Sequence, residues 1–248
     1  TPRVFWAPQP FRTEVGASFI HMSEEGRLWR RDLGLDARHA ISPGLAVAGF
    51  AAFSLAESRL AELDVGPRWQ LRRDVELTAA YRRTAPDLFL PRSSIFSVFA
   101  ETARDDIGAS VTHQLTDAWT ITGDYRAILV EGVPGSDAGL GAALRSGRTY
   151  AALHTRRLSG IENGFLQGRL SASRQLNRGW GVAGDLDLYR LERPINAARG
   201  SFFATASATW RPLPALFSAL SLGAGSTPLY ARRFEVMAKF AYAFGGAP

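Results

Sequence analysis

The chain has 248 residues and no cysteine, which excludes disulfides, thiolate metal sites and cysteine nucleophiles. Its formal charge is +6, and every basic side chain other than histidine is an arginine except Lys239. The arginines recur along the chain and do not gather with aromatic residues on one element, which argues against a nucleic-acid-binding stripe. No stretch approaches the roughly 18 consecutive apolar residues that a transmembrane helix needs. If the chain lies in a membrane, it must cross with strands.

Residues 11–19 begin a series of segments in which apolar and other side chains alternate. In this first segment Phe11, Val15 and Phe19 share one face. A β-strand sends successive side chains to opposite faces, so the alternation predicts strands with one apolar side. Turn-forming residues, such as Ser42-Pro43-Gly44, separate several of the segments. The predicted strands are residues 11–19, 29–37, 45–55, 63–71, 75–81, 107–115, 119–129, 140–144, 149–157, 166–172, 180–188, 202–210, 216–224 and 233–244.

The last of these segments carries the clearest pattern. Phe234, Val236 and Phe240 lie on one face of residues 233–244, and the segment has about the ten-residue length that spans a bilayer. It resembles the closing strand of a bacterial outer-membrane β-barrel of the porin-like class. In that class a C-terminal aromatic strand ending in Phe is the assembly signal, so the resemblance implies recognition by the barrel-assembly machinery, although residues 245–248 follow it. The alternative is an edge strand of a soluble sandwich.

The whole series predicts an all-β fold, a transmembrane antiparallel up-and-down β-barrel of about 14 strands, with a range of 12 to 16. Residues 1–10 are expected to form an N-terminal periplasmic segment, residues 11–244 the barrel and residues 245–248 a C-terminal tail. Fourteen strands enclose too wide an interior for side chains to fill. We therefore expect apolar faces to point outward to lipid and polar faces inward to water, in the outer membrane of a Gram-negative cell envelope. The chain has no signal peptide and no initiator Met, so it is expected to be a processed mature protein or the C-terminal part of something longer.

Tryptophan placement gives an independent indication of this arrangement. Outer-membrane barrels carry aromatic girdles where the apolar belt meets the lipid headgroups. Trp69 and Trp210 end predicted strands and Trp119 and Trp180 begin them, so that all four fall at one rim. The predicted lipid-facing girdle is Trp69, Trp119, Trp180, Trp210, Tyr242 and Phe244.

The polar faces of the predicted strands carry both signs of charge. These residues could set up a transverse field across a diffusion pore, or they could form cross-strand ion pairs that hold the barrel together. The sequence leaves both possibilities open. The residues predicted to line the pore are Arg30, Arg38, Arg68, Arg82, Arg126, Arg145, Arg169, Asp32, Asp36, Asp64, Glu76, Asp124, Asp185 and Asp187.

Residues 84–106 interrupt the regular spacing, because this stretch is too long for an ordinary hairpin connection and contains two prolines and an apolar block. In porins the third extracellular loop folds into the barrel and narrows the pore. The resemblance therefore implies a constriction loop formed by Asp87, Phe89, Arg92, Phe96 and Phe99. In the alternative interpretation residues 95–103 form another strand, and Asp87 belongs to a turn.

Catalysis and cofactor binding have little support in the sequence. His21, His39, His113 and His154 lie on separate segments, and none has a neighbouring catalytic signature. His154 alone, expected to point inward beside Arg156, is a candidate for mutation. We expect no enzyme activity, no metal and no cofactor.

These observations favour an outer-membrane channel, a porin-like barrel for passive passage or export of polar solutes. One alternative is a plugged structural barrel or export portal that anchors an envelope-spanning complex, and another is a soluble β-protein that binds anionic ligands. The expected partners are outer-membrane lipid and lipopolysaccharide, the barrel-assembly machinery through the C-terminal strand, and proteins of an envelope complex. No nucleic acid is expected.

Overall fold

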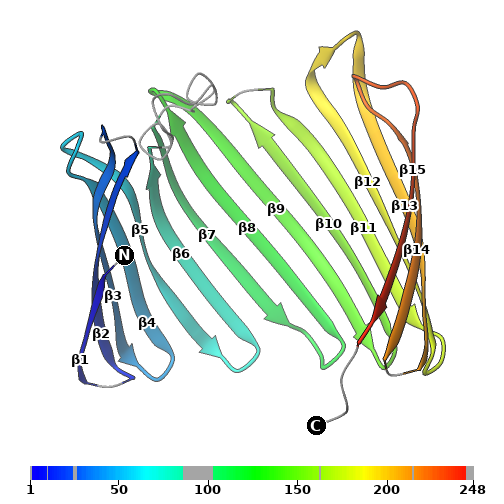
Figure 1. Cartoon of the computed structure of the whole chain (residues 1–248), viewed down its shortest axis with the longest axis horizontal. Coiled ribbons are helices and arrows are strands. Elements are labelled where there is room, and N and C mark those ends of the chain that lie inside the picture. The colour runs from blue at the N-terminus through cyan, green and yellow to red at the C-terminus, as the bar shows by residue number, and fades with distance from the viewer. Residues whose placement is uncertain are drawn as a thin grey trace. The chain divides into compact units, whose positions relative to one another are not determined.

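The computed structural model of the chain describes residues 2–9, 11–24, 27–85, 103–161, 163–213 and 215–243. These described residues form fifteen antiparallel strands that follow one another in chain order in one sheet (Figure 1). None of the described residues belongs to a helix that is long and apolar enough to cross a bilayer. The strands are β1 (Arg3–Gln9), β2 (Thr13–Glu24), β3 (Arg27–Ser42), β4 (Leu45–Ser54), β5 (Arg59–Arg72), β6 (Val75–Thr84), β7 (Arg104–Gln114), β8 (Trp119–Val130), β9 (Val133–Ser146), β10 (Thr149–Ser159), β11 (Phe165–Gln175), β12 (Trp180–Ile195), β13 (Ala198–Leu213), β14 (Leu216–Ser226) and β15 (Arg233–Tyr242).

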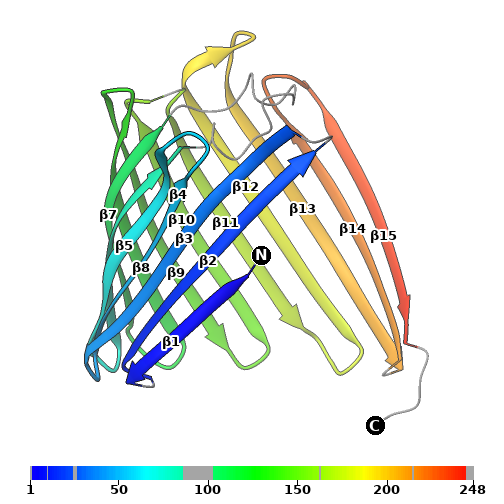
Figure 2. The same ribbon diagram turned by 60° about the vertical axis from the view of Figure 1, so that its left-hand side comes forward.

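The chain divides into two compact units. Unit 1 comprises Thr1–Thr112 and Asp124–Asp137, and unit 2 comprises His113–Gly123 and Ala138–Pro248. In unit 1, β1 to β6 pair successively, and β1 lies along β2 (Figure 2). In unit 2, β10 to β15 pair successively in the same manner.

Tight turns set the register of several hairpins. Glu131 and Gly132 join β8 to β9 with φ of 51° and 81°. Asn196 and Ala197 join β12 to β13 with φ of 49° and 64°. Two consecutive positive φ values define the type I′ turn, whose twist matches that of the strands that it joins. Such turns fix which residues face each other across each pair.

Residues 3–9, which the sequence placed in an N-terminal periplasmic segment, form strand β1. Pro8 lies within this strand, although proline cannot donate a hydrogen bond to a strand ladder. The register between β1 and β2 shifts between Trp6 and Gln9, which places Pro8 at an irregularity where proline is tolerated. The described strands therefore number fifteen, within the expected range but odd.

Several predicted strand boundaries are wrong; β12, for example, continues to Ile195, whereas the predicted strand ended at residue 188. Phe11 was expected to start a strand on the apolar face, but it lies in the turn before β2 with φ of 65°. The predicted strand 140–144 is only part of β9, which starts at Val133. The connection predicted over residues 84–106 is shorter, because Thr84 ends β6 and Arg104 begins β7.

Candidate functional site

The two faces of each strand differ in chemistry and in exposure, as β11 and β12 illustrate. Leu166, Leu170 and Leu188 lie on one face and are exposed, whereas Asp185 and Asp187 on the other face are half-buried. We call these two sides the apolar face and the polar face. A soluble fold would shelter the leucines and expose the carboxylates.

The same inversion holds for the described residues of both units. The buried polar or charged residues are Asp32, Ser54, Asp106 and Asp137, and Asp137 is fully buried. Large apolar side chains are exposed on strand after strand, for example Leu153 on β10, Leu220 on β14 and Val236 on β15. The apolar face therefore exposes its large side chains, and the buried carboxylates lie on the polar face.

Ion pairs connect neighbouring strands along the polar face of unit 1. An Nη atom of Arg68 on β5 lies 2.8 Å from Glu76 of β6, and an Nη atom of Arg82 on β6 lies 2.7 Å from Asp64 of β5. Both pairs join strands that are already paired through their backbones. These contacts favour the cross-strand role for the charges concerned.

Two further ion pairs of unit 1 each contain a buried carboxylate. Asp32 is almost fully buried and pairs with Arg30, which lies two residues away on the same strand. On β7, Nε of Arg104 lies 2.7 Å from Oδ1 of buried Asp106. In both cases the arginine lies two positions before the carboxylate, so the two side chains share one face of the strand.

Among the described residues, the ion pair with the most buried carboxylate joins β8 to β9. An Nη atom of Arg126 donates to Oδ2 of Asp137 at 2.6 Å, and the exposed fractions of the two side chains are 36% and 0%. A buried carboxylate that lost its cationic partner would be costly. We conclude that Arg126 stabilises the pairing of β8 with β9 as well as lying on the polar face of the sheet.

In unit 2 a smaller network occupies the polar face of β11 and β12. Arg169 lies 3.5 Å from Asp185 and 3.8 Å from Asp187. Ser171 donates a hydrogen bond to Asp185 at 2.5 Å, and Gln167 donates one to Asp187 at 3.1 Å. Both carboxylates are therefore held from the neighbouring strand.

Glycines make room for charged side chains that lie flat against the wall. A Cβ atom on Gly16 would meet Oδ1 of Asp36 at 2.6 Å, and one on Gly108 would meet Cγ of Arg126 at 2.4 Å. The space over Gly16 lets Asp36 of β3 reach Arg3 of β1 at 3.0 Å, across the intervening strand β2.

All fourteen residues that the sequence predicted to line the pore lie on the polar face of their own unit. For most of them the strand register gives the face directly, and Arg126 follows from its contact with Gly108. Arg38 and Asp124 make no ion pair with a described residue, and Arg145 lies 5.9 Å above the ring of Tyr150. The members that take part in ion pairs are Arg30, Arg68, Arg82, Arg126, Arg169, Asp32, Asp36, Asp64, Glu76, Asp185 and Asp187.

The sequence missed several charged residues of this wall. Asp137 and Arg3 lie in segments where no strand was predicted, although Asp137 alternates with Gly135 and Gly139 along one face of β9. The apolar face also holds a polar contact at the ends of β6 and β7. There Arg83 donates to both oxygens of Asp105 at 3.0 Å, and Tyr81 donates to Oδ1 of Asp105 at 2.6 Å.

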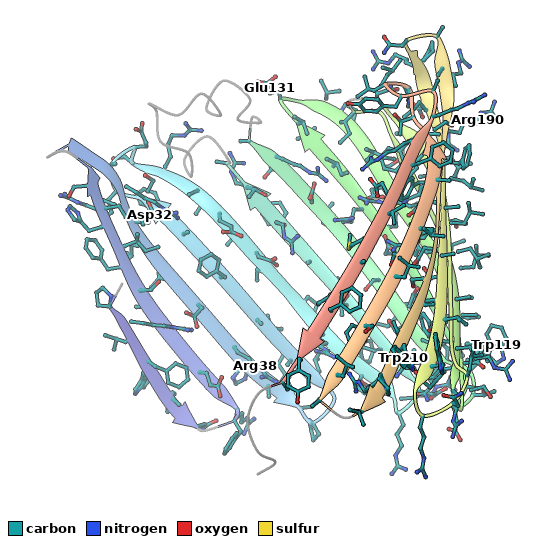
Figure 3. The ribbon with its side chains drawn as sticks, turned by 45° about the vertical axis from the view of Figure 1, so that its right-hand side comes forward. Asp32, Arg38, Trp119, Glu131, Arg190 and Trp210 are labelled. Atoms are coloured by element: carbon teal, nitrogen blue, oxygen red, sulfur yellow. The ribbon has the colours of Figure 1, made fainter. Side chains whose placement is uncertain are left out.

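The four tryptophans of the predicted girdle lie at strand ends: Trp69 of unit 1 beside the β5 to β6 turn, and Trp119, Trp180 and Trp210 of unit 2 at the end that carries the β7 to β8, β9 to β10, β11 to β12 and β13 to β14 connections, which we call the short-turn end. The rings of Trp180 and Trp210 stack at 5.8 Å between centroids, on paired positions of β12 and β13. In unit 2, Trp119 and Trp210 lie at this end, whereas Arg190 of β12 lies at the other (Figure 3). The predicted girdle residues found exposed at strand ends are Trp69, Trp119, Trp180, Trp210 and Tyr242; Phe244 lies outside the described residues.

An apolar band of membrane height separates the two ends of unit 2. From Trp180 to Arg190 the chain advances ten residues along β12, with Val182, Leu186 and Leu188 on the apolar face between them. At about 3.3 Å per residue and a tilt of about 45°, this corresponds to a height of about 23 Å. Outer-membrane barrels carry an apolar band about 25 Å tall.

The histidines do not converge. His39 hydrogen-bonds Thr13 at 2.9 Å, His21 lies 3.5 Å from Nε of Arg31, and His154 pairs in register with Arg169. Over the part of the chain that the structure describes, no three His or acidic side chains gather in a way that could hold a metal ion. The predicted constriction-loop residues Asp87, Phe89, Arg92, Phe96 and Phe99 lie outside the described residues.

No protein-family model and no curated protein matches the sequence. Solved structures do match the fold. The outer membrane channel DcaP of Acinetobacter baumannii aligns with a TM-score of 0.55 at 9% identity, over 95% of this chain and 99% of its own. Pseudomonas aeruginosa OpdK, crystallised with vanillate, aligns with a TM-score of 0.61 at 10% identity, over 93% and 75%. A bacterial polysaccharide outer membrane secretin aligns with a TM-score of 0.54 at 10% identity, over 98% and 89%.

At these identities the likeness concerns the fold. The chain has the all-β, antiparallel up-and-down architecture of the transmembrane barrels of the bacterial outer membrane, and the predicted porin-like class is confirmed at that level. The inverted distribution of apolar and polar side chains agrees with this fold, since such barrels are apolar outside and polar within.

Proposed function

We propose that this chain is a channel of the bacterial outer membrane, through which polar solutes pass passively or are exported. The observation that carries the proposal is the inverted distribution of side chains, with exposed leucines and aromatics on one face and charged side chains, including the buried and half-buried carboxylates, on the other. A polar barrel interior holds water, and water-filled barrels of this class conduct. The likeness to the channel DcaP supports the same function.

Conductance in planar lipid bilayers tests the proposal. Protein folded in detergent and checked by its heat-modifiable mobility on a denaturing gel should insert and give stepwise, steady currents in potassium chloride. The same protein boiled before addition is the control and should give none. A chain that folds by the gel criterion and inserts, yet carries no current, would contradict a passive channel.

A second candidate function is an export portal for a polymer, serving an envelope-spanning complex. The likeness to the polysaccharide outer membrane secretin supports it, since that alignment covers 98% of this chain. A polymer that enters the barrel should reduce the current, so a soluble polysaccharide added to one side of the bilayer separates the two candidates. A current unaffected by the polymer at any voltage speaks for small solutes.

The proposal includes two partners. The apolar face between Trp180 and Arg190 would contact outer-membrane lipid and lipopolysaccharide, and β15, with Phe234, Val236 and Phe240 on one face, would be recognised by the barrel-assembly machinery. The second point predicts that replacing Phe234 and Phe240 by serine slows assembly into membranes that contain the machinery. Folding of the same variant into detergent should change much less, and equal slowing in both settings would contradict recognition.

A further inference from the structure

A cavity of about 420 Å³ lies at the short-turn end of unit 2 and is basic. Three of its lining residues are arginines, Arg148, Arg178 and Arg211, and none is acidic. Arg148 and Arg178 lie in the β9 to β10 and β11 to β12 connections, and Arg211 lies near the end of β13, two residues before Leu213. None of the three guanidinium groups makes an ion pair with a described residue. We call these three residues the arginine rim.

Hydrogen bonds among the turns hold the cavity in shape. The backbone N–H of Gln175 donates to the carbonyl of Arg148 at 2.9 Å, and that of Arg211 donates to the carbonyl of Gly179 at 2.7 Å. Oδ1 of Asn177 accepts the backbone N–H of Gly179 at 2.8 Å and that of Trp180 at 2.9 Å. The turns are thus connected through their backbones, and the arginine side chains are left out of this network.

The arginine rim also has little negative charge near it. Asp185, on the polar face of β12, lies six residues beyond Gly179, which is about 20 Å along the strand. That distance is more than twice the screening length of about 8 Å at physiological salt. In the described connections at this end of unit 2 the acidic residue is Asp117, between β7 and β8. The strands near this end add the basic residues Arg145 of β9, Arg174 of β11 and Lys239 of β15.

Guanidinium groups suit a particular ligand chemistry. Their planar forks donate two parallel hydrogen bonds to a carboxylate or a phosphate. Arg211 lies 5.6 Å over the ring of Phe217, and Thr209 adds a hydroxyl group to the lining. A cavity of this volume is of the size that holds small organic ligands.

We propose that the arginine rim binds small oxyanions, carboxylates or phosphates, at the mouth of the channel and makes the channel prefer anions. Short turns face the periplasm in barrels of this class. The connections at the rim's end of unit 2 have two to four residues, whereas the other end has connections of five and six residues beside the two-residue β12 to β13 turn, so the rim is assigned to the periplasmic mouth. The inference rests on the proposed function, because it names the solute class of the same channel. Free solute passing the mouth is the source of the ligand.

The test compares one triple variant and one double variant of the full chain in planar bilayers. The rim variant carries Arg148→Gln, Arg178→Gln and Arg211→Gln, and the control carries Arg157→Gln and Arg190→Gln, which remove exposed arginines on the apolar face. Under a potassium chloride gradient the wild type and the control should favour chloride. The rim variant should lose this preference, with the chloride-to-potassium permeability ratio falling at least roughly threefold because the local positive field is removed. An unchanged ratio would overturn the proposal.

A binding measurement separates this inference from the proposed function. Titration calorimetry with citrate and, separately, with inorganic phosphate on detergent-solubilised protein does not require conduction. Each charge-assisted hydrogen bond lost should weaken binding about tenfold, so the rim variant should bind citrate far more weakly than the control. A chain that conducts but binds neither anion refutes the arginine rim alone. A chain that binds citrate at the rim without conducting refutes the channel alone.

Discussion

The assignment of an apolar and a polar face predicts different effects of the same substitution at two adjacent residues of β11. Leu170 lies on the apolar face between Leu153 and Leu186, and 47% of its surface is exposed. Ser171, the next residue, lies on the polar face beside Asp185. An arginine at position 170 should therefore meet lipid, and an arginine at position 171 should meet water.

The structure sets the size of the effect. Leu170 pairs with Leu186, which lies six residues from Trp180 and four from Arg190. With about 3.3 Å per residue and a tilt of about 45°, Leu170 lies about 14 Å above the tryptophan end of a band about 23 Å tall, close to its middle. An arginine on the lipid face costs about 2–4 kcal/mol at the bilayer midplane. Leu170→Arg should thus lower the folding equilibrium constant roughly 30- to 700-fold.

Equilibrium urea titration of the chain in phospholipid vesicles, followed by tryptophan fluorescence, measures this free energy. Ser171→Arg should cost about 1 kcal/mol, the worth of the hydrogen bond to Asp185 that it removes. A cost for Ser171→Arg equal to or larger than that for Leu170→Arg would refute the assignment of the two faces. Two variants that cost nothing would show that neither face of β11 meets hydrocarbon.

Three further predictions follow from the wall of unit 1 and the tryptophan end of unit 2. Arg126→Met should lower the free energy of unfolding by about 3 kcal/mol, because it removes the guanidinium group that pairs with the fully buried carboxylate of Asp137. Arg68→Met, at a side chain that is 71% exposed, should lower it by less than about 1 kcal/mol in the same urea titration. Gly16→Val should cost about 1–3 kcal/mol by displacing the carboxylate packed on it, and Gly168→Val, with nothing within 4 Å of its Cβ position, should cost nothing; equal costs would contradict the packing argument. The fluorescence of Trp210 as the sole tryptophan should be quenched more by spin-labelled lipid with a shallow label than by one with a deep label, and the opposite order would remove it from the interface.

The faces of the strands were predictable because the period of two is a property of the backbone. Each predicted polar residue of β12, such as Asp185 and Asp187, lies on the sheltered side, and each leucine assigned to lipid lies on the other. A shift by one residue would turn every side chain to the wrong face, so a strongly alternating strand admits one orientation. Strands with large apolar residues were therefore recognised from sequence.

Strands that lack such contrast were missed or shortened. In β9 the residues Gly135, Asp137 and Gly139 alternate with Ser136 and Ala138, so the first half of the strand has a weak hydrophobic signal even though its polar face holds the fully buried carboxylate. β1 contains Pro8, which the sheet tolerates because the register between β1 and β2 shifts between Trp6 and Gln9. Neither feature follows from periodicity alone.

Ion-pair partners were not predictable for a different reason. Arg3 and Asp36 lie 33 positions apart and meet across β2, which requires both hairpin registers and the empty space above Gly16. Registers are set by turn geometry, for example the two positive φ values at Glu131 and Gly132. The alternation in the sequence therefore predicts which charges lie on the polar face, whereas the strand registers determine which of them form ion pairs.

The distribution of paired and unpaired charges explains why the arginine rim should govern selectivity. An ion pair such as Arg82 with Asp64, at 2.7 Å, presents a small dipole whose field falls off faster with distance than that of a single charge. Most of the carboxylates and arginines of the wall are neutralised in this way, so they stabilise neighbouring strands and add little net potential to the water beside them. Unpaired guanidinium groups act as full charges within the screening length of about 8 Å. Arg148, Arg178 and Arg211 lack such partners among the described residues and share one cavity, so a passing anion would meet their positive potential undiminished by a paired carboxylate.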